Sequence, residues 1–366
     1  MIIGIDGNEA NIKNRVGSGV YALELLKQFS KLKKHHFVVY LKDHPLPSLP
    51  KETDNFKYKV FGPKKLWTRF ALPIKLFFGT KIDVFFSPSH YGPRFSPKPN
   101  VITIFDLSYI HFPEMFKKDD LYQLRNWTAQ SVKKTSAIIT ISESSKKDII
   151  SYYHVEKNKV LVSYPGYNSL LFKPQSKIKI ESIKKKYKIS GDYIIFVGTL
   201  QPRKNIERLI DAFSQVNEDL KLVIVGKKGW LFDSIFKKIK DLNLRKDVIF
   251  TDYVDAQDLP PLISGAKAFV LPSLWEGFGI PVIEAQACGT PVVVSSTSSL
   301  PEIVGDSGIL VDPESVESIS SGIKKTLTDP KATSDLVERG FGNIKRFSWQ
   351  KCAAETLTVL EKVAPK

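Results

Sequence analysis

The sequence predicts an α/β protein built from two consecutive doubly wound domains. Its 366 residues are too many for one ordinary hydrophobic core and correspond to about two domains. Short apolar, β-rich runs alternate with helical patterns, which is typical of parallel sheets covered by helices. This alternation is interrupted at residues 164–190, a segment rich in Pro, Ser and Lys, and then begins again. We interpret that segment as the region between the domains.

The first half contains short apolar runs of the kind that form buried strands. They lie at residues 2–5, 37–41, 84–86, 101–104, 137–141 and 160–162. Helical patterns separate them, for example at residues 20–32 and 120–134. Ser142, followed by Ser145-Lys-Lys-Asp148, is typical of an N-cap that opens a further helix. These elements predict a first domain over residues 1–172.

The second half repeats the alternation. Strands are predicted at residues 193–197, 222–225, 248–250, 268–270, 291–294 and 308–311. Helices are predicted at residues 206–215, 280–288 and 316–326, and a long helical pattern at residues 348–363. The second domain is therefore expected over residues 190–346. Two doubly wound domains place a ligand cleft between them, at the carboxyl ends of their strands.

The net charge of +16 is unevenly divided: residues 1–170 carry +12 and the remainder +4. Such a field favours an anionic partner for the first half, such as phospholipid, polyprenyl phosphate, nucleic acid or acidic glycan. Lysines used only for solubility explain the charge equally well. No basic and aromatic platform for nucleic acid is recognisable, so we expect no nucleic-acid partner.

The cysteine content and the lengths of the apolar stretches indicate the cellular compartment in which the protein is expected. Cys288 and Cys352 are the only cysteines, too few for a disulfide framework, and neither has a His or Cys neighbour at metal-ligand spacing. Met1 leads directly into a predicted strand, and neither a signal sequence nor an apolar stretch of about 18 residues is present. We expect a cytoplasmic protein.

The most informative segment is Glu276-Gly-Phe-Gly-Ile-Pro-Val-Ile-Glu284, which follows a predicted strand. Its glycines allow close approach of the backbone to a ligand, and Pro281 suits the first turn of a helix. The free N–H groups of that helix would attract a phosphate or sugar oxygen. A capping Glu276 and a surface Glu284 would explain the spacing too. However, the helix reads as mostly buried, where an unpaired Glu284 would be costly.

A second segment, residues 197–205, lies between a predicted strand and a predicted helix. Arg203 and Lys204 are adjacent there, and two cations in such a loop can neutralise a diphosphate. As an isolated pair they would be better explained as solvated surface. In a third segment, Gly17-Ser18-Gly19 opens a helix after the first strand, which a simple turn and cap explains about as well.

The segment 276–284 resembles the Glu-x7-Glu signature of family-four retaining glycosyltransferases. The resemblance continues through Ala-Gln-Ala-Cys-Gly-Thr-Pro-Val-Val at residues 285–293 and Leu-Pro-Glu-Ile-Val-Gly at residues 300–305. It implies a GT-B fold, with two Rossmann-like domains facing an interdomain cleft. It also implies that Glu276 contacts the donor sugar and that Glu284 binds ribose hydroxyls. Backbone N–H groups at Phe278, Gly279 and Ile280 would hold sugar and phosphate oxygens.

Residues 198–205 are similar to the family's Gly-x4-Arg-Lys-Asn/Gly pattern. The resemblance implies that Gly198, Arg203 and Lys204 surround the donor diphosphate. Two cations would also remove the need for a divalent metal, and no Asp-x-Asp pair is present. We therefore expect no metal and no cofactor beyond the nucleotide-sugar substrate. By the same resemblance, Gly17 and Gly19 belong to a glycine loop that faces donor phosphate and acceptor.

Residues 104–114 resemble the His-Asp-Leu-Ser…Pro-Glu segment of mannosyltransferase-like members. Asp106 matches that segment and is a candidate site residue. Phe105 replaces the family's usual His, and His111, five residues beyond Asp106, does not inherit its role. Residues 251–259 match the loop that lies against the nucleobase, which makes Val254 the expected base-packing residue.

Residues 64–78 mix lysines and Arg69 with aromatic and aliphatic side chains. This composition suits either an anionic membrane surface or a core helix, and Pro73 interrupts the apolar stripe in both cases. The tail at residues 347–366 resembles the family's C-terminal helix, which returns to the first domain. The resemblance thus spans almost the whole chain.

The family resemblance implies a retaining hexosyltransferase, with the acceptor bound by the first domain and the donor by the second. The resemblance of the Asp-Leu-Ser segment alone favours GDP-mannose as the donor, while UDP-glucose, UDP-N-acetylglucosamine and dTDP-rhamnose stay open. The expected acceptor is a glycan or polyprenyl-linked glycan of a cell-surface polysaccharide, used at the inner face of the membrane. The alternatives are another GT-B enzyme, such as an epimerase or phosphorylase, and a non-catalytic protein that binds glycan or nucleotide sugar.

Overall fold

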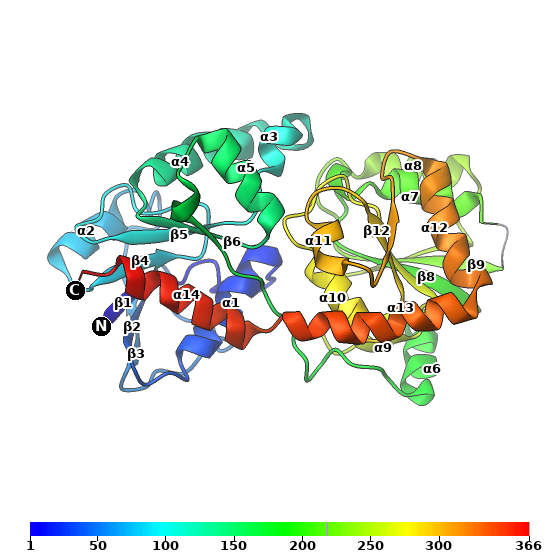
Figure 1. Ribbon diagram of the computed structural model, residues 1–366, viewed down its shortest axis with the longest axis horizontal. Helices are drawn as coiled ribbons and strands as arrows, with labels where there is room; N and C mark the ends of the chain where they lie inside the picture. The colour runs from blue at the N-terminus through cyan, green and yellow to red at the C-terminus, as the bar shows by residue number, and fades with distance from the viewer. Residues whose placement is uncertain (217–218, 366) are drawn as a thin grey trace. The chain divides into compact units, whose positions relative to one another are not determined.

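The computed structural model describes residues 1–216 and 219–365, which form two compact units. The first unit comprises Met1–Gly166 and Phe347–Lys366, and the second comprises Tyr167–Arg346. Each unit contains one parallel β-sheet with helices packed against it (Figure 1). The chain is therefore divided six residues earlier than the predicted end of the first domain.

The sheet of the first unit has seven strands in the order β3-β2-β1-β4-β5-β6-β7. The strands are β1 (Ile2–Asp6), β2 (His36–Leu41), β3 (Phe56–Val60), β4 (Val84–Ser87), β5 (Asn100–Ile104), β6 (Ala137–Thr140) and β7 (Val160–Val162). The helices are α1 (Gly17–Phe29), α2 (Ala71–Phe78), α3 (Ser108–His111), α4 (Lys118–Lys134), α5 (Glu143–Tyr153) and α14 (Trp349–Val363), with 3-10 turns η1 (Pro113–Met115) and η2 (Lys157–Lys159). Strands β4, β5 and β6 are buried along their whole length, as expected for a sheet covered on both faces.

The first unit confirms the strands and helices predicted for the first half, including the N-cap: the Ser142 side chain accepts a hydrogen bond from the backbone N–H of Ser145. Strand β3 was missed. Its sequence, Phe-Lys-Tyr-Lys-Val, alternates lysines with apolar residues, and it forms the edge of the sheet beside β2. Lysines are common on edge strands because they discourage pairing with other chains, and they hide the apolar signal of a strand.

The last helix, α14, belongs to the first unit and lies beside α1 (Figure 1). Ser348 caps it by accepting a hydrogen bond from the N–H of Lys351. The Ser163 hydroxyl donates to the carbonyl oxygen of Cys352 at 3.1 Å, which ties the helix to the end of β7. The last residues of the chain therefore complete the core of the unit in which the chain begins.

The sheet of the second unit has six strands in the order β10-β9-β8-β11-β12-β13. The strands are β8 (Asp192–Val197), β9 (Leu220–Val225), β10 (Val248–Asp252), β11 (Ala268–Leu271), β12 (Val292–Ser295) and β13 (Ile309–Val311). The helices are α6 (Lys177–Lys186), α7 (Ile206–Ser214), α8 (Asp233–Asp241), α9 (Leu259–Ser264), α10 (Ile280–Ala287), α11 (Leu300–Val304), α12 (Val316–Thr328) and α13 (Pro330–Asn343), with 3-10 turns η3 (Pro202–Lys204) and η4 (Ile344–Arg346). The predicted strands of the second half are all present.

The segment taken as the region between the domains contains a helix of the second unit. Helix α6 packs against α9, with Ile183 buried, and the Tyr187 hydroxyl donates to Asp258 at 2.9 Å. The many lysines of α6 make its apolar stripe, which packs on the second unit, hard to recognise in the sequence. This packing places the division of the chain at Gly166.

Candidate active site

The order of the strands brings two of the predicted site segments together. In the second sheet β8 pairs with β11, although β9 and β10 lie between them in the sequence. The strand order reverses at this point, and side chains that follow neighbouring parallel strands meet at their carboxyl ends. The loop after β8 carries Arg203 and Lys204 in η3, and the loop after β11 carries Glu276.

Glu276 forms ion pairs with both cations. Lys204 Nζ lies 2.5 Å from Glu276 Oε1, and Arg203 Nη1 lies 3.2 Å from Oε2. The side chains of Glu276, Lys204 and Arg203 are only 8%, 12% and 15% exposed. Burial opposes ionisation of Glu276, but the charges of Lys204 and Arg203 outweigh it and lower the pKa of this carboxyl to about 2. Glu276 is therefore an anion at neutral pH.

Backbone contacts hold these two loops in place. The guanidinium of Arg203 also donates to the carbonyl oxygen of Trp275, and the carbonyl oxygen of Arg203 accepts from the N–H of Leu274 at 2.9 Å. Asn205, in the left-handed conformation with φ 58°, donates to the carbonyl oxygens of Pro272 at 2.9 Å and Pro313 at 2.6 Å. The cations and the carboxylate are thus parts of one rigid arrangement.

Two serines fix the backbone of Glu276 from the other side. The N–H of Glu276 donates to Ser298 Oγ at 2.9 Å, and the Ser299 hydroxyl donates to the carbonyl oxygen of Glu276 at 2.8 Å. Asn205, Ser298 and Ser299 were not among the predicted site residues. The Asn at the end of the Gly-x4-Arg-Lys-Asn pattern was the available signal for the first, whereas the serines depend on contacts made only in the folded chain.

The loop from Glu276 leads into α10 through Phe278 and Gly279. Phe278 is buried, and Gly279 is the N-cap of α10 with φ 96°, a conformation that favours glycine. Because glycine has no side chain, the cap position contributes no side-chain acceptor to the first N–H groups of the helix, which begins at Ile280. A helix start of this kind can bind an anionic oxygen.

Replacing Gly279 by Ala is expected to destabilise the protein by about 1–2 kcal/mol, because alanine is strained at this φ. A Cβ there would also lie 2.7 Å from Leu300 Cδ2. Gly342 in α13 is the matched control, since a Cβ at that position meets no atom within 4 Å. Gly342→Ala should be neutral or stabilising. Urea unfolding of both variants tests this, and equal stabilities would contradict it.

Glu284 lies in α10, two turns beyond Glu276, and is half-buried. Burial raises the pKa of its carboxyl to about 8. Within the described residues the carboxyl group has no hydrogen-bond partner. In contrast to Glu276, it is largely protonated at neutral pH. The two predicted carboxylates therefore have opposite electrostatic environments.

Replacing Glu284 by Gln is expected to stabilise the protein at about pH 9 but not at about pH 4. The pKa in the folded state lies above the ordinary value of 4.5. The cost of ionising the buried carboxyl is thus absent below about pH 4.5, grows with pH and is complete above about pH 8. We expect a gain of about 1–2 kcal/mol at the higher pH, less than the full shift because Glu284 is partly exposed. Urea unfolding of wild type and variant at both pH values measures it; the exposed Glu338→Gln is the control.

The other predicted residues of the second unit flank this arrangement. Gly198 follows β8, and a Cβ at Gly198 would lie 3.5 Å from Lys204 Cε. Gly226, at the end of β9, packs so closely that a Cβ there would lie 1.9 Å from the carbonyl oxygen of Gly198. Val254, after β10, is buried. Gly198 is thus in direct reach of the cation cluster, whereas Val254 lies in a separate loop.

Three predicted site residues belong to the first unit. Gly17 and Gly19 lie at the start of α1; Gly17 has open space around it, whereas a Cβ at Gly19 would lie 2.9 Å from the carbonyl oxygen of Glu9. Asp106 follows β5 and accepts hydrogen bonds from the N–H of Ser108 at 2.8 Å and from its hydroxyl at 2.6 Å. The Asp106 carboxylate thereby stabilises the start of α3.

The aromatic residue before Asp106 contacts a histidine that sequence reasoning did not single out. The N–H of Phe105 donates to His90 Nε2 at 3.3 Å, and the two rings lie 5.7 Å apart. Burial lowers the pKa of His90 to about 4, against the opposing charge of Asp106. His90 is therefore neutral at physiological pH. His111, by contrast, lies 3.6 Å from Asp148 on α5.

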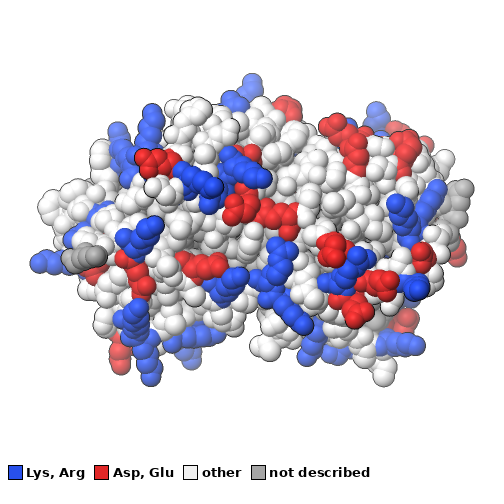
Figure 2. Space-filling model, viewed as in Figure 1, with Lys and Arg blue, Asp and Glu red and all other residues white. Residues whose placement is uncertain are grey.

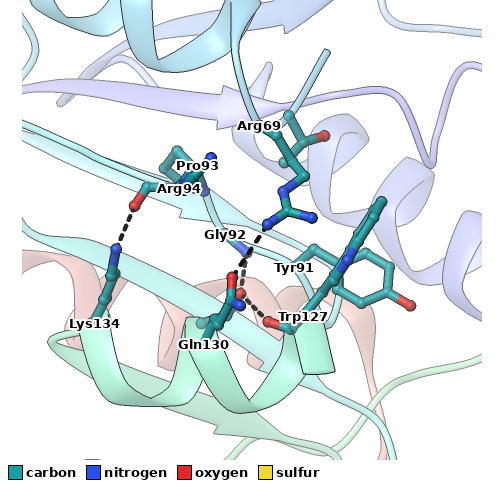
Figure 3. Close-up of a pocket in the computed structure, with 10 residues that line it drawn as sticks. Arg69, Tyr91, Gly92, Pro93, Arg94, Trp127, Gln130 and Lys134 are labelled. Atoms are coloured by element: carbon teal, nitrogen blue, oxygen red, sulfur yellow. Dashed lines mark hydrogen bonds between the residues drawn. The ribbon is translucent and has the colours of Figure 1, made fainter. Parts of the chain in front are cut away.

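The first unit contains a pocket of about 230 Å³ at the carboxyl ends of its strands. It is lined by Asp6, Asn8, Glu9, Lys42, Lys64, Leu66, Trp67, Thr68, Arg69, Ser89, Tyr91 and Trp127. Asp6 ends β1, and burial raises the pKa of its carboxyl to about 6 although Asn8 donates hydrogen bonds to it. A smaller pocket of about 30 Å³ adjoins it (Figure 3). There the Arg69 guanidinium lies over the Trp127 ring at 4.8 Å and donates to Gln130 at 3.4 Å.

Residues 1–216 and 219–365 contain neither a cluster of metal ligands nor a helix that could span a membrane. No group of three or more His, Cys, Asp or Glu side chains among them is arranged to hold a metal ion. In the same part of the chain, every helix is too short or too polar to cross a membrane.

Two family models together match most of the chain. The family model described as "Glycosyltransferase Family 4" matches residues 16–169, and the model "Glycosyl transferases group 1" matches residues 179–342. The chain is 31% identical over 279 residues to the O-antigen chain mannosyltransferase B of Escherichia coli, covering 75% of this chain and 73% of that protein. It is 32% identical over 250 residues to the O-antigen chain mannosyltransferase RfbU of Salmonella typhimurium, covering 67% of each.

Another relative is much longer than the matched region. The chain is 32% identical over 227 residues to the serotype-specific mannosyltransferase WbdA of Escherichia coli, but this match spans only 28% of that protein.

Solved structures share the fold at low sequence identity. Sucrose-phosphate synthase from Thermosynechococcus elongatus superposes with a TM-score of 0.79 at 18% identity, covering 99% of this chain and 98% of that one. Anabaena Alr3699/HepE, solved in complex with UDP and glucose, also superposes with a TM-score of 0.79, at 19% identity and 99% coverage of both chains. These likenesses establish the GT-B fold. With both family models and relatives above 30% identity in agreement, the chain belongs to glycosyltransferase family 4 and is a hexosyltransferase.

Proposed function

We propose that this enzyme transfers mannose, with retention at the anomeric carbon, from GDP-mannose to a glycan or polyprenyl-linked glycan in the synthesis of a cell-surface polysaccharide. Two relatives are named as O-antigen chain mannosyltransferases, which supports mannose as the transferred sugar and a polysaccharide as the product. The observation that carries the chemistry is the buried cluster of Lys204, Arg203 and Glu276 at the carboxyl ends of β8 and β11.

The cations of this cluster are suited to the departing group. As the bond between the anomeric carbon and the diphosphate oxygen breaks, negative charge builds on the diphosphate. The acceptor hydroxyl oxygen bonds to the carbon, and the hydroxyl proton passes to the departing diphosphate oxygen. Arg203 and Lys204 carry several N–H donors each, so they can bind phosphate oxygens and still contact Glu276. Fixed positive charge in a nearly buried site stabilises that developing anion strongly. In this proposal the two cations take the place of a divalent metal.

Glu276 suits the donor sugar. With a pKa of about 2 its carboxylate only accepts hydrogen bonds, which matches hydroxyl groups that donate them. Lys204 and Arg203 hold the carboxylate in position through their ion pairs with it. The donor would therefore meet a group that needs no reorganisation.

We assign the remaining donor contacts to α10 and to the loops after β8 and β10. The N–H groups around Phe278, Gly279 and Ile280 would bind sugar and phosphate oxygens at the helix start. Glu284 would accept hydrogen bonds from the ribose. Because the pKa of Glu284 is about 8 without ligand, such binding favours the ionised form, so nucleotide affinity should rise as the pH increases toward 8. Gly198 and Val254 would border the diphosphate and the nucleobase.

The acceptor is assigned to the pocket of the first unit. Its carboxylates Asp6 and Glu9, the cation Lys42 and the rings of Tyr91 and Trp127 are the kinds of group that bind sugars. Asp106, Gly17 and Gly19 are the further candidates of that unit.

A ligand panel tests the proposal. GDP-mannose and GDP should raise the apparent melting temperature at concentrations where UDP-glucose, UDP-N-acetylglucosamine and dTDP-rhamnose do not, because a ligand that binds only the folded state stabilises it. Transfer is then measured with radiolabelled mannose donor, and the anomeric configuration of the product is read by NMR. Preference for a UDP or dTDP sugar would refute the donor, and an inverted product would refute retention.

A further inference from the structure

Helix α2 exposes a stripe of large apolar side chains. Phe70, Ile74, Phe77 and Phe78 are 48%, 61%, 55% and 88% exposed. Phe70 is the N-cap of α2, and the other three lie four, seven and eight residues beyond it, on one face of the helix. None of the four lines either pocket of the first unit. Water-exposed apolar residues grouped in this way mark an interaction surface.

The opposite face of α2 is anchored in the hydrophobic core. Ala71, Leu72 and Leu76 are buried in one cluster with Trp67, whose indole N–H donates to the carbonyl oxygen of Phe61 at 3.0 Å. This buried face agrees with the core-helix interpretation of residues 64–78 made from the sequence. The exposed stripe is held rigidly at the surface, where it is available to a partner.

The chain around α2 carries positive charge only. Between Asp54 and Asp83 there is no acidic residue, and the seven basic ones are Lys57, Lys59, Lys64, Lys65, Arg69, Lys75 and Lys81. Lys65 and Lys81, which precede and follow the stripe in the sequence, are exposed, and Lys64 pairs with Asp43. In Figure 2 the uncharged surface at the end of the first unit where α2 lies is bordered by Lys and Arg atoms.

We propose that the stripe of Phe70, Ile74, Phe77 and Phe78 inserts into the interfacial region of a bilayer that contains anionic phospholipid, with the neighbouring lysines on the headgroups. Apolar side chains flanked by basic ones combine area burial with electrostatic attraction at such a surface. A second copy of the chain fits less well, because a two-fold interface would bring two basic segments together. This docking does not depend on the identity of the donor sugar.

Vesicle sedimentation tests the apolar contribution. The full-length protein should bind vesicles of phosphatidylcholine with about 30% phosphatidylglycerol far better than vesicles of phosphatidylcholine alone. The double variant Phe77→Ser, Phe78→Ser should bind the anionic vesicles about tenfold or more weakly. The control is Leu170→Ser, Ile178→Ser, which removes two apolar side chains that are 86% and 84% exposed in the second unit. The control should bind like wild type.

A second pair of variants tests the charge. Lys65→Gln, Lys81→Gln should lower binding to anionic vesicles about tenfold or more, since each lysine near a bilayer contributes about one kcal/mol. Lys324→Gln, Lys325→Gln, which removes two exposed lysines of α12, should leave it unchanged. Raising the salt should weaken binding of wild type, because headgroup attraction is screened.

A fluorescent label locates the contact without weakening it. Cys288 and Cys352 are buried, so an introduced Phe78→Cys can be labelled selectively with a polarity-sensitive dye. Anionic vesicles should shift its emission to the blue, while the same label at Ile178→Cys should not respond. An unshifted label, or equal loss of binding in the matched controls, refutes the proposal. So does a concentration-dependent dimer that the Phe77, Phe78 variant abolishes while vesicle binding persists.

Discussion

Replacing Glu276 by Gln is expected to lower kcat/KM for sugar transfer by about 100- to 1000-fold. The amide keeps the shape of the side chain but loses the charge that Lys204 and Arg203 hold in place at 2.5 and 3.2 Å. It also replaces one acceptor oxygen with a donor, so it cannot accept as many hydrogen bonds from sugar hydroxyls. Initial rates of transfer with the preferred donor measure this.

A control variant and measurements of folding distinguish a loss of catalysis from a loss of structure. Glu338→Gln removes an exposed carboxylate on α13 of the same unit and should leave the rate unchanged. Circular dichroism and urea unfolding show whether the Glu276 variant is folded under assay conditions. A folded Glu276→Gln enzyme that transferred sugar at the wild-type rate would remove Glu276 from the site.

Replacing Lys204 by Met should destabilise the protein by about 2–4 kcal/mol in the absence of nucleotide. The change leaves Glu276, which is 8% exposed, paired with Arg203 but no longer with Lys204. Removing one partner of a nearly buried ion pair leaves the other charge buried without compensation, which is destabilising. Urea unfolding at neutral pH measures the loss. We also expect a lower kcat, because a cation facing the diphosphate is gone.

A second substitution separates charge burial from simple loss of packing. Adding Glu276→Gln to Lys204→Met should recover part of the lost stability, since the uncompensated carboxylate is then absent. The control is Lys221→Met, whose partner Asp247 is 38% exposed; it should cost about 1 kcal/mol or less. This account is contradicted if the two substitutions are simply additive, so that the double variant is less stable than Lys204→Met by as much as Glu276→Gln alone destabilises the wild type.

The same ion pairs predict how stability depends on pH. The pKa of Glu276 lies at about 2 in the folded state, below its ordinary value of 4.5. The stabilisation is therefore complete above about pH 4.5 and is lost as the pH falls toward 2. In Lys204→Met the pKa of Glu276 should move upward, so the difference in stability between wild type and variant should shrink on acidification through that range.

Most of the fold could be predicted from the sequence because buried parallel strands leave a strong local signal. Runs such as residues 84–86 and 268–270 are apolar throughout, and the structure buries β4 and β11 on both faces. Elements that mix lysines with apolar residues were not predicted. Strand β3 carries lysines because it is an edge strand, and α6 shows one buried residue, Ile183, among many lysines.

Several features of the candidate site could not be predicted from the sequence. Lys204 and Glu276 are 72 residues apart, and nothing local indicates that they touch. Ser298 and Ser299 support Glu276 only because their loop folds against it. His90 contacts Phe105 only because β4 and β5 are neighbours in the sheet. Side-chain pairs of this kind depend on strand order, which a pattern of hydrophobicity does not contain.

The sequence by itself determined two α/β domains, the loops that follow β8 and β11, and the glycines and charged residues within those loops, because each depends on near neighbours in the chain. The tertiary structure decided how these residues act on one another. By pairing β8 with β11 it brought Arg203 and Lys204 onto Glu276 and lowered the pKa of that carboxyl to about 2. By burying α10 it raised the pKa of Glu284 to about 8, although both residues are glutamates of one short motif. The physical reason is that charge and solvation depend on distances through space.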